Sequence, residues 1–236
     1  ISETISVLRA GGLVVFPSDT VYGLLVDAKN ERAVSKLLTF KDRAPGKAVA
    51  VFVPSFESIA THAHLSKKNE TTLRQILPGA YTIALPSKHT LDTRLESEKG
   101  TLGVRLPDYK PVAALTSEYK SPITATSANM AGRSPHHSIK SLLNQISEKK
   151  KDMIDLIVDA GTLPRNKPST VVDLSGNTIQ TLRHGDASFD QSTSFTSASP
   201  QETQQIGKDL MVRYSSGDKP LVIILTGDLG AGKTEM

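Results

Sequence analysis

Three positive charges lie close together in one short segment of the chain. Lys41, Arg43 and Lys47 fall within seven residues, and Pro45 and Gly46 make a helix costly there. Hydrogen bonds from such cations contribute about 1.5 to 3 kcal/mol each when they are partly desolvated. The segment is therefore a candidate binding loop for a triphosphate, and a solvated surface loop is the alternative for this cluster taken alone.

Hydroxyl, amide and guanidinium groups recur near the ends of later predicted strands. Ser127 and Asn129 offer neutral donors, which bind phosphate oxygens without adding charge. Arg105 can bind a carboxylate with two parallel hydrogen bonds, which a lysine cannot do. Thr20 and Ser169 can hold a small polar substrate beside it. Together these residues predict an anion site next to a site for a small polar molecule.

The chain is organised around residues 11–23. The apolar run 13–16 predicts a short buried strand, and the strand should stop at Pro17, which has no backbone N–H to donate. Gly23 is expected to turn the chain away at positive φ. The polar side chains expected to face a ligand between these two points are those of Ser18, Asp19, Thr20 and Tyr22.

Predicted helices and strands alternate along the first 186 residues. This alternation, with one hairpin around residues 176–177, indicates an α/β domain with a twisted mixed sheet and flanking helices. The polar stretch 87–99 is expected to be a mobile loop or lid. Further strands are expected at 48–53, 81–85, 102–106, 123–126, 153–158, 170–174 and 178–182, and helices at 2–9, 30–40, 71–77, 112–119 and 138–146.

Composition limits the possible chemistry. The formal net charge is +4, which is compatible with nucleotide or RNA binding. The chain has no cysteine, so disulfides and thiolate catalysis are excluded, and its six histidines show no metal-ligand spacing. We therefore expect no metal site built from protein residues. No apolar run approaches the roughly 20 residues needed to cross a bilayer, so a cytoplasmic protein is expected.

The C-terminal segment has a different composition. Residues 187–198 are rich in Ser, Thr and Gln and read as a linker, and a new unit with a helix at 201–214 and an apolar strand at 221–226 is expected over 199–236. A phosphate-binding loop follows that strand, with Gly227, Gly232, Lys233 and Thr234 as its motif residues. The sequence ends two residues later, and without an acidic partner for magnesium this unit is not expected to hydrolyse ATP.

Five ordered segments resemble the YrdC-like threonylcarbamoyl-adenylate synthases (TsaC family). They are residues 17–23, 41–43, 127–129, 168–173 and 182–183, and the resemblance covers about residues 1 to 186. It implies an enzyme that combines L-threonine, bicarbonate or CO2, and ATP into threonylcarbamoyl-AMP and pyrophosphate for a tRNA modification. It also implies a twisted, mostly parallel sheet with a basic cleft. Magnesium would share the charge of the leaving group.

The same resemblance implies roles for individual residues. Thr20, Arg105 and Ser169 would hold threonine, and Lys41 and Arg43 would be catalytic. The chain departs from the family with Asp19 in place of a frequent glutamate, Lys47 in place of asparagine and Phe52 in place of histidine. The nucleotide and its phosphates would be surrounded by Lys41, Arg43, Lys47, Thr101, Ser127, Asn129 and Arg183.

The C-terminal segment resembles the beginning of the TsaE ATPase of the same pathway. A fusion of these two components implies contact with other tRNA threonylcarbamoylation proteins, TsaD-like or TsaB-like, and possible contact with tRNA. Two other functions remain open: a double-stranded RNA or tRNA-binding module with incidental nucleotide binding, and a P-loop regulator whose first domain senses nucleotide. Aromatic residues make up only 5% of the chain, which argues against recognition of single strands.

Overall fold

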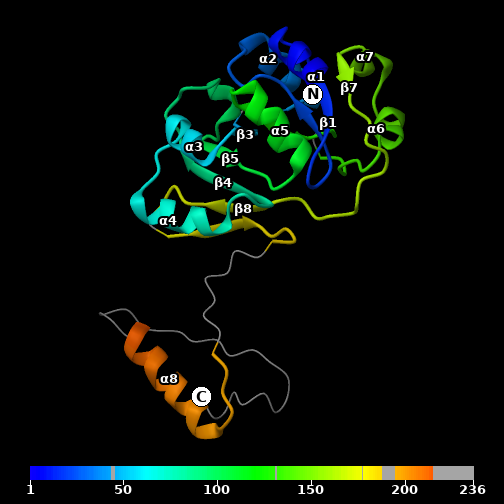
Figure 1. Ribbon diagram of the computed structural model, residues 1–236. Helices are drawn as coiled ribbons and strands as arrows, with labels where there is room; N and C mark the ends of the chain where they lie inside the picture. Colours follow the sequence, from blue (N-terminus) through cyan, green and yellow to red (C-terminus); the bar gives the residue numbers. More distant parts are fainter. Residues whose placement is uncertain (44–45, 131, 177, 188–194, 215–236) are drawn as a thin grey trace. The chain divides into compact units, whose positions relative to one another are not determined.

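A computed structural model describes residues 1–43, 46–130, 132–176, 178–187 and 195–214 (Figure 1). The chain divides into two compact units, Ile1–Phe189 and Asp190–Met236. The described part of the second unit contains helix α8, Pro200–Tyr214, close to the helix expected there. The predicted phosphate-binding loop lies outside the described residues. No helix in the described part of the chain is long and apolar enough to span a membrane.

The first unit is built on one nine-stranded sheet with the order β7-β1-β2-β6-β3-β5-β4-β8-β9. The strands are β1 Val14–Pro17, β2 Tyr22–Leu25, β3 Ala50–Phe52, β4 Tyr81–Pro86, β5 Thr101–Arg105, β6 Ile123–Ser127, β7 Leu156–Ile157, β8 Thr170–Asp173 and β9 Gln180–Arg183. The α-helices are α1 Ser2–Arg9, α2 Glu31–Lys41, α3 Phe56–His62, α4 Lys67–Ile76, α5 Lys110–Tyr119, α6 Ile139–Gln145 and α7 Glu148–Lys151.

The sheet is mixed, as expected, but antiparallel pairs outnumber parallel ones. Among the described pairings, β1–β7, β3–β5 and β4–β8 are parallel and the other five are antiparallel. The resemblance implied a mostly parallel sheet. The difference arises partly because β1–β2 and β8–β9 are consecutive strands joined by short connections, which favour antiparallel pairing. The β8–β9 pairing confirms the predicted hairpin.

The chain reverses direction between β1 and β2 earlier than expected. β1 ends at Pro17 as predicted, and the Ser18 hydroxyl then donates to the carbonyl oxygen of Val21 at 2.7 Å. Gly23 lies inside β2 and has no positive φ, so the prediction that it turns the chain is wrong. Tyr22 is fully buried, and its hydroxyl donates to the Gly161 carbonyl, so it faces the core rather than a ligand.

Helices cover the two faces of the sheet unequally. One core contains buried residues of α2, α3, α4 and α6, and the other contains residues of α1 and α5. The strands contribute to both cores because successive side chains point to opposite faces: Val15 packs in the first core, and Val14 and Phe16 pack in the second. Among the described helices, only α1 and α5 therefore contribute buried residues to the second core.

Local signals account for several helix ends. Asn30 caps α2, as predicted, because its side chain accepts hydrogen bonds from the backbone N–H groups of Arg32 and Ala33. Ser138 caps α6 in the same way. The sequence analysis missed α3, which starts at a reciprocal cap formed by Ser55 and Ser58.

Residues 87–99 form a packed segment, in contrast to the expected mobile loop. Leu95 is fully buried at the end of a 3-10 turn, Thr93–Leu95, and its carbonyl accepts a hydrogen bond from the backbone of Val49 at 2.8 Å. The Ser87 hydroxyl donates to the buried carboxylate of Glu96 at 2.7 Å. The first contact joins the segment to the residue that precedes β3, and the second joins two residues of the segment itself, so both apolar and polar groups of the segment are satisfied inside the unit.

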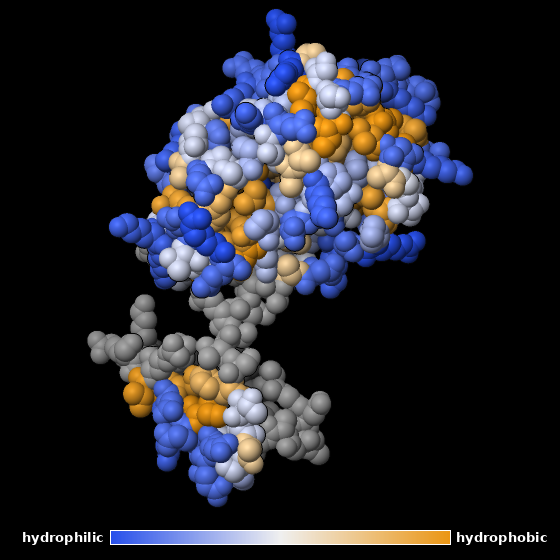
Figure 2. All heavy atoms as spheres, viewed as in Figure 1, coloured by the Kyte–Doolittle hydropathy of each residue, from blue (hydrophilic) through white to orange (hydrophobic). Residues whose placement is uncertain are grey.

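The surface shows where hydrophobic residues remain accessible. The visible face of the first unit is mostly hydrophilic, with hydrophobic patches between the polar side chains, and α8 also presents hydrophobic residues (Figure 2). Met211 and Val212 on α8 are exposed, as is Leu182 on β9.

Candidate active site

A pocket of about 360 Å³ opens over the central strands. Small residues form much of its floor, because Ala84, Gly103 and Ala125 on neighbouring strands all line it. A Cβ added at Gly103 would lie 3.2 Å from the Cβ of Ala50. The pocket lies on the face where Phe52 points, which is the face on which α1 and α5 pack. The two helices leave enough of this face open for a ligand, and the volume falls in the usual range for small-molecule sites.

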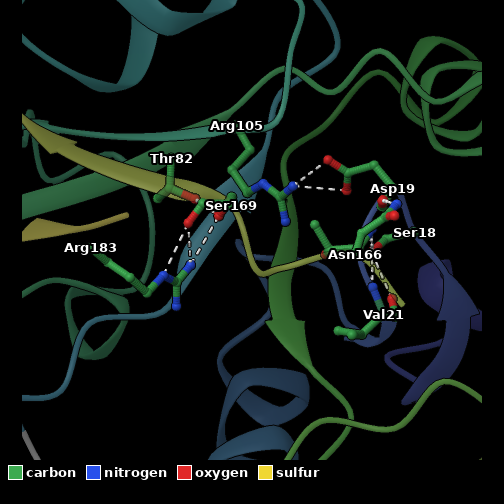
Figure 3. Close-up of polar contacts among 9 residues, drawn as sticks. Ser18, Asp19, Val21, Thr82, Arg105, Asn166, Ser169 and Arg183 are labelled. Carbon is green, nitrogen blue, oxygen red and sulfur yellow. Dashed lines mark hydrogen bonds and ion pairs between the residues drawn. The ribbon is translucent and has the colours of Figure 1, made fainter. Parts of the chain in front are cut away.

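Arg105 at the end of β5 forms a buried ion pair with Asp19. Its Nη2 donates to both carboxylate oxygens of Asp19, at 2.8 and 2.7 Å, and the two side chains are 8% and 11% exposed (Figure 3). The Phe52 ring lies 4.9 Å from the guanidinium carbon, a distance suited to a cation–π contact. Burial lowers the pKa of Arg105, and the charge of Asp19 opposes this shift.

Arg183 on β9 is held by neutral oxygens instead. Its Nε and Nη2 donate to the Ser169 carbonyl at 3.0 and 2.8 Å, and Nη2 also contacts the Ser169 hydroxyl at 3.0 Å (Figure 3). That hydroxyl lies 2.7 Å from the hydroxyl of Thr82 on β4. Burial lowers the pKa of Arg183, and the positive charge of Arg105 lowers it further. The two guanidinium groups therefore stand close enough to interact across Ser169.

Arg43 lines the pocket after the end of α2. Its Nε donates to the Lys47 carbonyl at 2.9 Å, and its Nη2 donates to the Ala48 carbonyl. Burial lowers the pKa of Arg43. Because both acceptors are neutral, the positive charge of the guanidinium has no countercharge among these contacts.

Hydroxyl groups complete the wall of the pocket. Thr20 and Ser18 line it from the β1–β2 turn, and Ser127 lines it from the end of β6. Thr101 and Ser97 also line the pocket, and their hydroxyl oxygens lie 2.7 Å apart. These groups come from segments far apart in the sequence.

Lys41, Lys47 and Asn129, which the sequence analysis assigned to the nucleotide, do not line this pocket. Lys41 is buried, and its Nζ donates to the carbonyl oxygens of Ser127 and Asn129 at 2.5 and 2.9 Å. The Asn129 amide donates to the Met130 carbonyl at 3.0 Å, and Lys47 contributes only its carbonyl to Arg43. Burial, with a smaller effect from Arg43, lowers the pKa of Lys41 to about 7.

The pocket thus contains seven of the ten residues predicted to bind threonine or nucleotide: Thr20, Arg43, Thr101, Arg105, Ser127, Ser169 and Arg183. Three further residues of the site were not predicted from the sequence. Thr82 and Ser97 line the pocket, and the Asn166 amide donates to the Asp19 carbonyl at 3.0 Å. The only signal for Thr82 is its position in strand β4, two residues before Ala84, because alternate residues share one face.

The lining carries more positive than negative charge. Its charged members are Arg43, Arg105 and Arg183, and no described residue that lines the pocket is Asp or Glu. No group of three or more His, Cys, Asp or Glu residues in the described part of the chain could hold a metal ion. The arrangement can bind anionic groups without a resident metal.

Comparison with known proteins identifies the relatives of this chain. A sequence profile of the Sua5/YciO/YrdC family, described as "Telomere recombination", matches residues 6–185. The chain belongs to this family. The resemblance noted in the sequence to YrdC-like proteins is therefore confirmed.

Named members of the Sua5/YciO/YrdC family include enzymes. A threonylcarbamoyl-AMP synthase of Vibrio vulnificus is 28% identical over 188 residues, which make up 78% of this chain and 98% of that protein. A putative threonylcarbamoyl-AMP synthase of Mycobacterium tuberculosis is 32% identical, over 81% of this chain and 86% of that protein. The crystal structure of P. abyssi Sua5 complexed with L-threonine matches with a TM-score of 0.71 and 28% identity. This match covers 78% of the chain, which spans 53% of the length of P. abyssi Sua5.

Proposed function

We propose that this pocket is the active site of an L-threonylcarbamoyl-AMP synthase. The reaction condenses L-threonine, bicarbonate or CO2, and ATP to threonylcarbamoyl-AMP and pyrophosphate, so the chain is an ATP-using nucleotidyltransferase. The observation that carries the proposal is that three arginines and the hydroxyls of Thr20 and Ser169 line one pocket in a Sua5/YciO/YrdC family member. The bacterial relatives named threonylcarbamoyl-AMP synthase, matched over most of their length, support this function.

The amino acid would bind at Arg105. Its carboxylate would accept hydrogen bonds from the guanidinium, and the hydroxyls of Thr20 and Ser169 would contact its polar groups. The contact between the hydroxyls of Ser169 and Thr82 supports this assignment. A hydroxyl that is oriented by a neighbouring group can offer its next hydrogen bond to a ligand in a defined direction.

The nucleotide would bind on the side of Arg43 and Arg183, where Thr101 and Ser127 add hydroxyl donors. We assign the basic cleft that the family resemblance implied to this side. Lys41 and Asn129 would support it from behind, because Lys41 holds the backbone of residues 127 and 129. Lys47 would act through its backbone, which holds Arg43.

The chemistry needs no side-chain nucleophile. The nitrogen of threonine attacks the carbon of CO2 and loses a proton, which yields a carbamate. A carbamate oxygen then attacks the α-phosphorus of ATP, a new P–O bond forms, and the bond to pyrophosphate breaks. Positioning of the reactants and stabilisation of the developing negative charge by Arg43, and through the supporting contacts of Lys41, would supply the rate enhancement.

Magnesium would enter as part of the ATP substrate. The pocket lining offers no carboxylate, and the described residues contain no cluster suited to a metal ion, so the residues present do not fit a resident magnesium site. We therefore assign the ion to the phosphates of ATP.

The wider context remains part of the proposal. The division into residues 1–186, a linker at 187–198 and a TsaE-like unit at 199–236 rests on composition and on the motif at residues 227–234. Such a fusion supports action in the tRNA threonylcarbamoylation pathway, in the cytoplasm, with TsaD-like or TsaB-like proteins as partners and tRNA as a possible contact.

One assay tests the function. The chain is incubated with ATP, magnesium, bicarbonate and labelled threonine, and pyrophosphate release is measured. We expect release that requires both threonine and bicarbonate, together with a labelled adenylate product. Pyrophosphate formed without threonine, or no release by folded protein that binds double-stranded RNA, would instead favour a nucleotide sensor or an RNA-binding module.

A further inference from the structure

Asp19 is a largely buried carboxylate beside the pocket, and the sequence predicted only that it faces a ligand. Its two neighbours in the turn, Ser18 and Thr20, line the pocket, and its own carboxylate lies against Arg105 (Figure 3). Its carbonyl accepts a hydrogen bond from Asn166, so its backbone is held as well as its side chain. The position of this negative charge is therefore defined by contacts on two sides.

Arg105 keeps unused donor capacity despite this ion pair. Asp19 contacts only Nη2, and the buried Nε of Arg105 has no hydrogen-bond partner in the described structure. A buried donor without a partner is costly, and Arg105 lines the pocket. A ligand that brings an acceptor to this guanidinium would relieve that cost.

The ion pair also decides which ligand charge suits this position. A free guanidinium attracts any carboxylate, whereas Arg105 already has the negative charge of Asp19 at 2.7 Å. A simple carboxylate would add a second negative charge next to Asp19 in a site with little water to screen it. An α-amino acid brings its own ammonium group one carbon away from its carboxylate, so the ligand adds no net charge.

We infer that Asp19 makes this pocket selective for zwitterionic amino acids over carboxylic acids that lack the amino group. The inference rests on the proposed function, because it assigns the amino acid to Arg105. Asp19 acts here as a specificity-determining residue through its charge. Arg43 and Arg183 contact only neutral oxygens, so no comparable negative charge lies against them in the described contacts.

The test compares threonine with (R)-3-hydroxybutanoate, which is threonine without its amino group. The affinity of wild-type protein and Asp19→Asn for each ligand is measured by calorimetry at saturating ATP without bicarbonate, which prevents turnover. The affinity ratio of threonine to (R)-3-hydroxybutanoate is expected to fall on the order of tenfold in Asp19→Asn, mainly because the hydroxy acid binds more tightly. Competitive inhibition of pyrophosphate release by the hydroxy acid should strengthen in parallel.

Two further variants control for structural effects. Asp19→Glu keeps the charge, so the ratio should stay within about threefold of the wild-type ratio. Glu70→Gln removes an acid from the exposed Glu70–Arg74 pair of α4, which does not line the pocket, and should leave both affinities unchanged. Thermal unfolding of each variant shows whether Asp19→Asn is folded. If Asp19→Asn does not fold, Asp19→Glu still tests the inference, because a loss of selectivity in Asp19→Glu would contradict it.

Other outcomes would overturn the inference. An unchanged ratio in folded Asp19→Asn would remove Asp19 from ligand selection. An equal gain in affinity for both ligands would show that Asp19 only competes with any carboxylate for Arg105. These results differ from failure of the proposed function, in which wild-type protein would show no threonine-dependent pyrophosphate release at all.

Discussion

The proposed amino-acid side and the proposed phosphate side of the pocket hold their arginines in different ways. Arg105 is paired with the carboxylate of Asp19, whereas Arg43 and Arg183 donate to carbonyl and hydroxyl oxygens. A neutral acceptor orients a cation but leaves its charge available, and a carboxylate largely cancels it. The first arrangement suits a ligand with no net charge, such as an amino acid, and the second suits a polyanion such as a triphosphate. Similar side chains can thus serve two substrates because their buried partners differ.

The largest effect is expected on the amino-acid side. Arg105→Lys keeps the charge but loses the planar fork, so it cannot offer a ligand carboxylate two parallel hydrogen bonds while it holds Asp19. We expect kcat/KM for threonine to fall roughly ten- to a hundredfold, equivalent to about 1.5 to 3 kcal/mol, with little change in KM for ATP. Steady-state pyrophosphate release measures both constants.

The matched control for that variant is Arg74→Lys, at an exposed arginine of α4. It should behave like the wild-type protein. An Arg105→Lys protein that loses ATP affinity while threonine affinity persists would reverse the assignment of the two sides.

A smaller effect is expected on the phosphate side. Arg43→Gln removes one positive charge that has only neutral partners, so KM for ATP should rise about tenfold while the affinity for threonine is preserved. Arg43→Lys should recover part of the loss because it restores the charge. Weakened threonine binding with unaltered KM for ATP would contradict the comparison.

The third effect is on stability rather than on substrate binding, and it concerns the buried cation behind the phosphate side. Burial lowers the pKa of Lys41 to about 7, from 10.5 in an exposed lysine. Between these values the unfolded chain binds more protons than the folded one, so stability should rise with pH. The cost of burying the charge is fully present below about pH 7. Relative to Lys41→Met, the free energy of unfolding should increase from pH 7 to 9, approaching about 1.4 kcal/mol per pH unit.

Denaturant titrations at several pH values measure this difference. Lys68→Met, at an exposed lysine of α4, controls for the removal of a lysine charge. A stability difference between wild-type protein and Lys41→Met that stays constant from pH 7 to 9 would mean that Lys41 is protonated throughout this range in the folded protein.

Local chemistry allowed much of the fold to be predicted. Pro17 ends β1 because it has no N–H to donate, and Asn30 starts α2 because its side chain accepts from the first turn. α3 was missed because its short polar sequence, with a cap made by Ser55 and Ser58, has little helical periodicity.

The direction in which individual side chains point was harder to predict from the sequence. Lys41 was expected to meet phosphates, yet it points to the carbonyls of residues 127 and 129. Gly23 was expected to turn the chain, yet it lies in β2 because Ser18 closes the turn earlier. The prediction for Gly23 was wrong, whereas the role of Lys41 at the phosphates stays a prediction. Both cases concern groups whose partners come from the turn or from distant strands rather than from their own element.

The sequence by itself determined most of the helices and strands, but not β2 or α3. It also determined the family and the kinds of groups available to bind anions, because these depend on neighbouring residues and on motifs within single segments. Only the tertiary structure decided which cation is paired with a negative charge and which is not. That choice depends on strand pairing and packing, which bring Asp19 to Arg105 across 86 residues and leave Arg43 with neutral oxygens. Burial then magnifies the difference, since an ion pair and a lone cation differ most where water is scarce.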